Sequence, residues 1–437
     1  MRLTRPGTFL RWLDRHGLAR LGISAAARRG DAQARLFFDP AIRDDPYPFY
    51  REVREAGALV RGRLMWSTTR HDAVVAVLRG EAFSSDLESL PAPGPIAVVR
   101  RLGRSGRPIG PADPPSMLVV DPPTHTRYRR LVAKVFTPRA IEGLRPRIER
   151  HTEALLDDLA PAPGGTGTVE IIERYASLLP LTVIAEILGV PQHMRQRFLA
   201  WGEAATPTLD LGLTLRQYHH AEDAIRQLNA WLRGHFARLR ADPGDDLLSR
   251  LVHLDSEGER LTEEELLATA GLLLVAGFET TVNLLGTGIY LLIRHPDQLR
   301  ALRERPDGWP NAVEEILRYD SPAQTTARYC RADTEVAGVP VRAGEIVVPM
   351  MGGANRDPAV FPDPDRFDIT RANARDHLSF SSGVHYCLGA ALARLEGQLG
   401  LSAFFERYPD AALAAVPRRR PTRVLRGYDH LPVRLRP

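Results

Sequence analysis

The chain contains 437 residues, of which 44% are hydrophobic and 25% are charged, and it carries a formal net charge of +5. That length permits one large domain or two to three smaller ones, and the composition is ordinary for a soluble globular protein. So modest a charge does not indicate nucleic-acid binding, and no nucleic-acid-binding motif is present. Only two cysteines occur, Cys330 and Cys387, and no secretion signal precedes them. The sequence therefore predicts a cytoplasmic protein.

Residues 1–40 are rich in arginine and lack a continuous apolar stretch. Such a pattern predicts an amphipathic arm that is mobile or lies on the surface, and it is compatible with weak association with a membrane surface. Every basic residue of the chain except Lys134 is arginine, so the arginines of the arm follow a bias of the whole sequence. We expect a single domain over residues 41–437, because no linker divides that range.

Within the segment 83–117, residues 89–117 are rich in proline and glycine. Loops of this length in compact folds are commonly functional lids, and we expect this segment to be such a loop. Periodicity assigns the remaining ranges, which are β-like near 57–70, 333–349 and 417–437 and helical over 123–320 and 387–406. Together, these helical and β-like ranges predict a mainly α fold with small β-sheets.

Within the helical range, His125 and Arg129 are four residues apart and therefore share a helical face. Two such side chains on one face suit an anionic group, such as a carboxylate of a bound cofactor. A solvated face is the alternative, because arginine-rich segments are commonly exposed.

The most apolar stretch of the chain lies in a helix that begins after the capping box of Thr262 and Glu265 and ends near Arg294. At ~1.5 Å per residue its length is roughly 50 Å. By composition it could span a membrane. Glu279 and Asn283 in its middle, and the absence of a second apolar span, favour a central core helix instead.

Four residues in the middle of this helix have the chemistry of a catalytic site, namely Ala276, Gly277, Glu279 and Thr280. A buried carboxyl group beside a hydroxyl is suited to proton delivery, and the glycine leaves room for a ligand to approach the helix. The alternative is structural, because Thr280 could hydrogen-bond the carbonyl one turn earlier while Glu279 pairs with a distant arginine.

Cys387 follows Gly383 and His385 and precedes Gly389 and a run of leucines at helical spacing. The first turn of a helix has free N–H groups and a positive dipole end, which favour a thiolate. Cys387 is therefore a candidate axial ligand of haem iron. A plain buried cysteine is the commoner role of a lone thiol. The two cysteines lack the spacing of a zinc site, and the absence of secretory features disfavours a disulfide between them.

The chain resembles the cytochrome P450 family at several separate motifs. The haem-binding loop of the family is matched at Phe380, Gly383, His385, Cys387 and Gly389. Ser381 stands where the family usually has glycine, and we expect the loop to survive with altered backbone freedom. The oxygen-activation motif of the family is matched at Ala276, Gly277, Glu279 and Thr280.

The resemblance also assigns residues around a haem. Glu315 and Arg318 match the Glu-x-x-Arg pair of the family, and Arg366 would supply a third charge to that network. The haem propionates would be held by the residues that match the family's propionate positions, which are His125, Arg129, Arg328 and His385. Cys330 matches no ligand position and is expected to fill space.

The activity implied by the resemblance is that of a haem-thiolate monooxygenase, which holds haem b through Cys387 and uses O2 to oxidise a small apolar organic substrate. Thr280 would steady the bound oxygen, and Glu279 would gate protons arriving from solvent. Electrons would come from a ferredoxin and an NAD(P)H-dependent ferredoxin reductase, which would dock near Lys134, and the protein would be a monomer.

Two alternatives stay open at this point. A peroxide-driven P450 would replace the acid and threonine with an arginine–proline arrangement, and Glu279-Thr280 argues against it. A haem-thiolate sensor or carrier without turnover would keep Cys387 but would have no need for Glu279 and Thr280.

Overall fold

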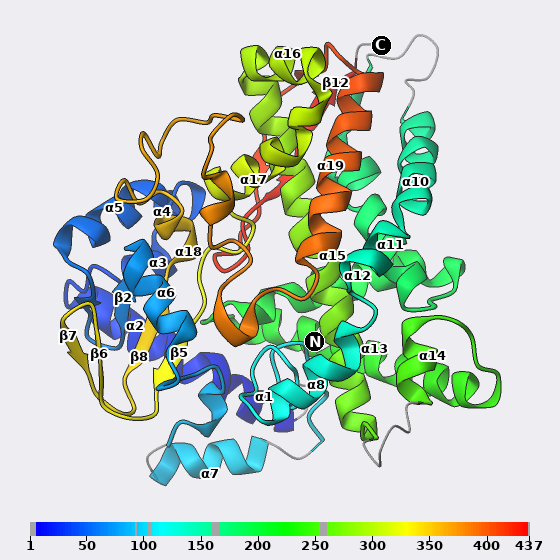
Figure 1. Cartoon of the computed structure of the whole chain (residues 1–437). Coiled ribbons are helices and arrows are strands. Elements are labelled where there is room, and N and C mark those ends of the chain that lie inside the picture. Colours follow the sequence, from blue (N-terminus) through cyan, green and yellow to red (C-terminus); the bar gives the residue numbers. More distant parts are fainter. Residues whose placement is uncertain (1–5, 92–93, 104–105, 160–166, 254–259, 436–437) are drawn as a thin grey trace.

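The computed structural model describes residues 6–91, 94–103, 106–159, 167–253 and 260–435. Helices form the larger part of the molecule, and the main β-sheet lies at one side together with α2 to α6 (Figure 1). The mainly α fold with small β-sheets predicted from the sequence is confirmed.

The longest helix, α15 (Glu263–Arg294), runs through the centre of the helical part (Figure 1). Its predicted capping box is present, because the Thr262 hydroxyl accepts from the Glu265 N–H and the Glu265 carboxylate accepts from the Thr262 N–H. By length and hydropathy α15 could cross a membrane, yet 83% of its most apolar stretch is buried inside the protein. It is therefore a core helix.

The helices that surround α15 come from both halves of the chain. Packed against it are α11 (Leu178–Ile187), α12 (Arg195–Ala205), α13 (Leu215–Ala241), α14 (Leu247–Val252), α16 (Pro296–Glu304), α17 (Trp309–Tyr319) and α19 (Ala390–Arg407).

The register between α15 and α19 is set by glycines. Gly397 lies against Leu284, and Gly288 lies against Leu401. The residue numbers rise together along both helices, so α15 and α19 run parallel. At ~1.5 Å per residue, the first turn of α19 is level with residues 276–280 of α15.

The remaining helical elements are mostly short. The α-helices are α1 (Pro6–Trp12), α2 (Leu18–Arg28), α3 (Arg35–Phe38), α4 (Pro40–Asp44), α5 (Tyr47–Ala56), α6 (His71–Arg79), α7 (Gly94–Gly103), α8 (Thr124–Ala133), α9 (Pro138–Glu142), α10 (Arg145–Asp158) and α18 (Met351–Ala354). The π-helical and 3-10 turns are η1 (Leu13–Gly17), η2 (Leu87–Ser89), η3 (Ile172–Ala176), η4 (Gln192–Met194), η5 (Thr206–Leu209), η6 (Pro306–Gly308), η7 (Ala374–Asp376) and η8 (Gly383–His385).

The main sheet has the strand order β1-β2-β8-β5-β3, in which only β2 and β8 are parallel. A three-stranded sheet (β4-β12-β9) and two antiparallel pairs (β6-β7 and β10-β11) complete the β-structure of the described residues. The strands are β1 (Val60–Arg61), β2 (Trp66–Thr68), β3 (Phe83–Ser84), β4 (Thr168–Glu170), β5 (Arg328–Cys330), β6 (Thr334–Val336), β7 (Val339–Val341), β8 (Ile346–Pro349), β9 (Ala412–Leu413), β10 (Arg418–Arg419), β11 (Tyr428–His430) and β12 (Pro432–Arg434). Strands lie in all three ranges predicted to be β-like, whereas β3, β4, β5 and β9 were not predicted.

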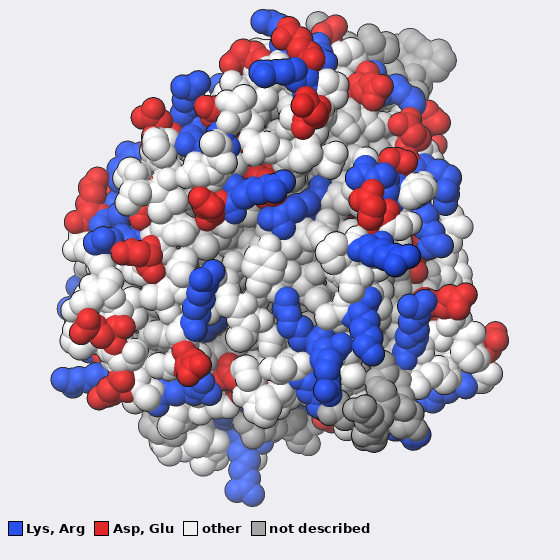
Figure 2. Space-filling model, viewed as in Figure 1, with Lys and Arg blue, Asp and Glu red and all other residues white. Residues whose placement is uncertain are grey.

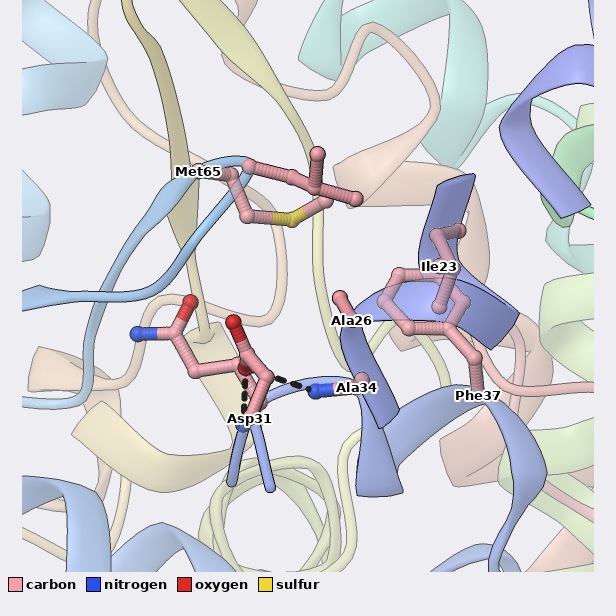
Figure 3. A pocket seen from close by; sticks show the side chains of 8 residues that line it. Ile23, Ala26, Asp31, Ala34, Phe37 and Met65 are labelled. Atoms are coloured by element: carbon pink, nitrogen blue, oxygen red, sulfur yellow. Dashed lines mark hydrogen bonds between the residues drawn. The ribbon is translucent and has the colours of Figure 1, made fainter. Parts of the chain in front are cut away.

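The N-terminal segment differs from the mobile or surface-lying arm predicted from the sequence. Its described part forms α1, η1 and α2, and both Arg11 and His16 are buried. Farther along, Asp31 accepts hydrogen bonds from the N–H groups of Gln33 and Ala34 beside a small hollow (Figure 3). The hollow is lined by Ile23, Ala26, Asp31, Gln33, Ala34, Phe37, Leu64 and Met65. The segment is therefore packed onto the protein, while a domain boundary at residue 40 stays a prediction and residues 1–5 lie outside the described residues.

The segment 83–117 also differs from a plain loop. It contains β3, η2 and α7, and residues 92–93 and 104–105 lie outside the described residues. Its proline content breaks these elements into short pieces, which is why its helical part carried no clear periodic signal.

Candidate active site

Cys387 lies three residues before α19, at the end of a loop that the Cys387 N–H closes by donating to the Phe380 carbonyl at 2.9 Å. The thiol is accessible to a solvent-sized molecule although it lies deep inside the protein. Burial raises the pKa of the Cys387 thiol, and the Gly389 N–H and the guanidinium groups of Arg129 and Arg394 act in the opposite direction. These cationic and N–H neighbours are the surroundings that stabilise a thiolate.

Two residues of this loop have a left-handed backbone, Ser381 with φ +61° and Gly383 with φ +70°. A Cβ at Gly383 would lie 2.8 Å from the Leu78 carbonyl, so a larger residue does not fit there. Ser381 adopts a conformation that glycine adopts without strain, and its hydroxyl is buried with no hydrogen-bond partner among the described residues. The departure from the family pattern at Ser381 therefore carries a conformational cost.

Cys330 has the space-filling position expected of it. It is buried in β5, where its Sγ donates to the Ala332 carbonyl at 2.9 Å. Both cysteines are free thiols, so no disulfide joins Cys330 to Cys387.

The middle of α15 is accessible on one side only. Ala276 is exposed, and Gly277 and Thr280 are partly exposed, whereas Val275 and Phe278 beside them are 2% and 0% exposed. Because the first turn of α19 is level with this stretch, the accessible thiol and the accessible side of α15 lie at the same depth of the molecule. We call this accessible side of α15 the Ala276–Thr280 face.

Glu279 points away from this face and is fully buried. Its Oε1 lies 3.1 Å from Nη1 of Arg420, in an ion pair whose geometry is not that of a hydrogen bond. Burial raises the pKa of Glu279, with Arg420 acting in the opposite direction and Glu203 adding to the rise. Thr280 donates from Oγ1 to the Ala276 carbonyl at 3.0 Å. The two contacts expected if Thr280 and Glu279 were purely structural, to a carbonyl one turn earlier and to a distant arginine, are thus both present. The Thr280 hydroxyl nevertheless keeps lone pairs that can accept a hydrogen bond from a ligand or water.

Basic side chains from three separate segments converge near Cys387. The rings of His125 (on α8) and His385 (in η8) lie 4.4 Å apart, and His385 Nε2 is 3.0 Å from the Ser85 hydroxyl. Burial, together with the Arg328 and His125 charges, lowers the pKa of His385 to about 3. The charge of Arg129 also lowers the pKa of both imidazoles. The structure therefore brings together all four residues of the predicted propionate set.

Arg328 is a buried cation without a local counterion. Its Nη1 donates to Thr326 Oγ1 at 3.0 Å and to the Ala327 carbonyl at 2.8 Å, and the described residues place no carboxylate within 4.0 Å of it. Burial lowers the pKa of Arg328 to about 10, and only the charge of Asp121 opposes that effect. A buried, unpaired guanidinium is costly unless an anionic ligand binds it, so this cluster fits the carboxylates of a haem.

The predicted Glu-x-x-Arg network is present, but its third member is not Arg366. Glu315 and Arg318 are fully buried and pair through two contacts, at 2.7 and 2.8 Å. The second cation is Arg371, whose Nε lies 3.2 Å from Glu315. The Arg366 side chain is 67% exposed, and only its carbonyl joins the network by accepting from Arg318 at 3.1 Å. The segment 367–370 between them turns so that Arg371, not Arg366, faces α17.

The sequence analysis missed a second group that holds the Cys387 loop. Glu314 is buried beside Arg394, whose Nε lies 2.8 Å from Glu314 Oε1. Arg394 also lies over the Phe380 ring, 4.5 Å from its centroid, and donates to the Tyr386 hydroxyl at 3.2 Å. A signal was available, because Arg394 is seven residues after Cys387 and so lies about two helical turns along.

An accessible thiol before a helix, an accessible helix face at the same depth and a buried guanidinium with no carboxylate within 4.0 Å among the described residues are the features expected of a haem-thiolate site. The chain belongs to the cytochrome P450 family, whose model, "Cytochrome P450", matches residues 109–307 and 310–412. The predicted family and the enzyme class, a cytochrome P450 monooxygenase, are confirmed.

Known relatives match the chain over nearly its whole length. Cytochrome P450 140 of Mycobacterium tuberculosis is 52% identical over 98% of this chain and 98% of its own. The 6-deoxyerythronolide B hydroxylase of Saccharopolyspora erythraea is 40% identical over 90% of this chain and 96% of its own. Among solved structures, CYP164A2 of Mycobacterium smegmatis superposes with a TM-score of 0.82 at 35% identity, covering 92% of this chain and 99% of that one.

Proposed function

We propose that this P450 is an oxygen-driven monooxygenase in which Cys387 is the axial ligand of haem b. One observation carries the proposal, namely that the accessible Cys387 thiol and the accessible Ala276–Thr280 face lie at the same depth of two parallel helices. When bound there, a haem with a thiolate ligand supplies the activation of O2. The four basic residues His125, Arg129, Arg328 and His385 would hold its carboxylates.

Glu279 and Thr280 are suited to the proton steps of this reaction. One oxygen atom enters the substrate, and the other leaves as water after taking up two electrons and two protons. The raised pKa of Glu279 lets its carboxyl group hold a proton nearer to neutral pH, so it can both donate and be reloaded. The Thr280 hydroxyl, on the accessible side, would accept a hydrogen bond and keep that proton near the reacting atoms. This pair favours an oxygen-driven enzyme over the peroxide-driven and non-catalytic alternatives.

The substrate is proposed to be a bulky apolar organic molecule. The core beside the Ala276–Thr280 face is apolar, with Val275 packed against Ala205 and Ile225. Two relatives are named for such compounds, the 6-deoxyerythronolide B hydroxylase and a vitamin D(3) 25-hydroxylase of Pseudonocardia autotrophica, and a structural neighbour, CYP109E1 of Bacillus megaterium, was solved with testosterone. A panel of such compounds, scored by the shift of the haem Soret band, would select the class that binds.

Electrons are proposed to come from a ferredoxin and its NAD(P)H-dependent reductase, because the sequence holds no flavin or iron–sulfur motif of its own. Basic side chains gather on the face that carries α8 and the loop before α19 (Figures 1 and 2). Lys134 and Arg139 are exposed there, as are the apolar Val384 and Tyr386 of the Cys387 loop. A basic surface with an apolar centre suits an acidic redox protein.

The test is the absorption spectrum of the reduced protein with carbon monoxide. Thiolate ligation gives the long-wavelength Soret band for which the family is named, and Cys387→Ser should abolish it. Cys330→Ser, at the buried β5 cysteine, is the matched control and should leave the band in place. A wild-type protein without this band, or one that keeps it after Cys387→Ser, would show that Cys387 is not the ligand.

A further inference from the structure

Helix α7 is held to the molecule mainly by the N-terminal segment. It packs against α1 and η1, and no other helix or strand of the described chain contacts it as extensively. Figure 1 shows α7 at the edge of the molecule beside α1. Its outer side is apolar and open, with Val98 57% and Leu102 58% exposed. The position of α7 therefore depends on α1 and η1 more than on the protein core.

Polar contacts fix the C-terminal half of α7 to this segment. Near its C-terminal end, the Gly103 carbonyl accepts from Arg11 Nη1 at 3.5 Å. In the last turn of α7, Arg100 Nε lies 3.4 Å from Asp14 of η1. The same Arg100 donates to the carbonyls of Glu88 and Leu90 at 3.0 and 2.9 Å, which ties α7 back to the chain that precedes it.

A charged cluster joins the N-terminal segment to the two chain segments that flank α7. Arg15 forms ion pairs with Glu88, before α7, and with Asp113, after it. Arg107 pairs with the same two acids, each at 2.9 Å. All four side chains are mostly buried, so the cluster is screened little by solvent.

The other side of the N-terminal segment is anchored on α13 and on the turn before it. Arg11 and Glu222 form an ion pair in which both side chains are only 4% exposed. Trp12 Nε1 donates to the Leu213 carbonyl at 2.8 Å, and Arg20 Nη1 donates to the Gly212 carbonyl at 2.9 Å. The segment thus bridges α7 and α13, which have no extensive contact with each other.

One of the two bridged elements, α13, packs beside the part of α15 that carries Ala276. Asn229 of α13 hydrogen-bonds both the N–H and the carbonyl of Ile109, at 2.9 and 3.1 Å. Ile225, one turn earlier on α13, packs with Ala205 and Val275, next to the exposed Ala276. The segment that follows α7 and helix α13 are therefore joined next to this part of α15.

We propose that residues Pro6–Gly17 are an anchor that holds α7 in place and thereby set how fast, and for molecules of what size, the Ala276–Thr280 face is reached. The family model begins its match at residue 109, so this anchor lies outside the matched range. The inference rests on the proposed function only in that the Ala276–Thr280 face is taken as the substrate side of a haem.

The experiment weakens the anchor in the full-length holoprotein with Arg15→Gln, and more gently with Asp14→Asn, which removes only the contact with Arg100. The matched control is Arg35→Gln, which breaks an exposed ion pair with Glu52 at 3.0 Å in the same part of the chain, away from α7. Stopped-flow binding of imidazole and of 4-phenylimidazole to the ferric haem reports entry, and hydrogen exchange of residues 96–103 reports the opening of α7.

Arg15→Gln should speed binding and release of 4-phenylimidazole together, by about tenfold, because a buried ion-pair network couples its members by a comparable factor. Imidazole, which is smaller, should change less, and exchange in α7 should rise by a similar factor. Asp14→Asn should shift both readouts in the same direction to a smaller extent, while Arg35→Gln leaves them unchanged.

Unchanged α7 exchange in both Arg15→Gln and Asp14→Asn would overturn the anchor, as would equal acceleration by Arg35→Gln. Faster α7 exchange with unchanged entry of both azoles would overturn the gating role. If the wild-type protein gave no azole spectrum at all, the haem assignment would fail instead, and hydrogen exchange would still decide whether the segment holds α7.

Discussion

At the scale of single residues, Thr280 and Thr281 have different surroundings although they are adjacent. Thr280 is on the accessible side of α15, where its hydroxyl donates to the Ala276 carbonyl at 3.0 Å. Thr281 is buried, and its hydroxyl lies 3.5 Å from the Gly277 carbonyl. Only Thr280 can therefore present an acceptor to a ligand on the Ala276–Thr280 face.

Thr280→Ala is expected to uncouple oxygen consumption from product formation. Without the hydroxyl, protons would no longer be held at the reacting oxygen, so product per O2 should fall at least about tenfold while peroxide release rises. Oxygen uptake, peroxide and product are measured together. Thr281→Ala should lose a little stability but keep its coupling, and equal uncoupling in the two variants would remove the special role of Thr280.

Ser381 gives a prediction about stability. Its left-handed backbone costs a non-glycine residue about 1–2 kcal/mol, and its buried hydroxyl has no partner among the described residues. Ser381→Gly removes both costs but loosens the unfolded chain, so we expect a net gain of about 1 kcal/mol in the free energy of unfolding. Denaturant unfolding of the holoprotein measures it.

Ser382 is the matched control for that substitution. Its backbone is extended, with φ −150°, and its hydroxyl accepts from Arg79 Nε at 2.7 Å. Ser382→Gly should therefore lose about 2 kcal/mol, because a hydrogen bond to a charged group disappears and backbone freedom increases. A loss of stability in Ser381→Gly as well would mean that the Ser381 hydroxyl has a partner in the holoprotein.

At the scale of elements, the Glu315 network joins α17 to the loop that leads towards Cys387. Arg318 donates to the carbonyls of Asn355 and Pro364 at 3.0 and 2.9 Å, and Arg371 donates to the Pro362 carbonyl at 2.6 Å. Two cations thus hold one irregular loop by its backbone. The loop has little hydrogen-bonded secondary structure of its own, so its shape depends on these side chains.

Arg371→Ala should destabilise the protein by roughly 3 to 5 kcal/mol, because it leaves the buried Glu315 carboxylate with one cation and several carbonyls without donors. Arg366→Ala should change stability by less than about 0.5 kcal/mol, because that side chain is solvated and its carbonyl remains. Unfolding curves and haem retention compare the two variants. A larger effect of Arg366→Ala would restore the assignment made from the sequence.

The network also shows where sequence reasoning stops at this scale. Glu315 and Arg318 could be predicted because helical spacing places them on one face. Which of Arg366 and Arg371 joins them could not be predicted, because the segment between these two arginines has no repeating geometry. The same holds for α7, whose helix is bounded by prolines and glycines and is stabilised by packing on a distant segment rather than by its own periodicity.

At the scale of the whole molecule, the sequence predicted the core better than the edges. The course of α15 and the mainly α class followed from apolar periodicity and a capping box, which are local signals. The packing of the N-terminal segment depends on the pair of Arg11 with Glu222, which lies more than two hundred residues away in the chain. No local pattern marks such a pair, so a polar, arginine-rich segment was predicted as an arm that is mobile or lies on the surface.

The charge distribution of the molecule gives a last prediction, about electron transfer. Basic side chains surround α8 on the face shown in Figure 2, and Lys134 is exposed at the end of that helix. If an acidic ferredoxin docks there, Lys134→Glu should slow reduction of the haem at low ionic strength by about tenfold, because electrostatic steering raises association rates by that order or more. Stopped-flow reduction at limiting ferredoxin measures the rate.

The distance dependence of charge screening separates docking from a general effect of net charge. Arg342→Glu makes the same charge change in the turn between β7 and β8, on the side of the molecule that carries the main sheet, and should leave the rate almost unchanged. At about 1 M salt the Debye length falls to about 3 Å, so the Lys134→Glu and wild-type rates should converge. A slow rate that persists at high salt, or equal slowing by Arg342→Glu, would place the docking site away from α8.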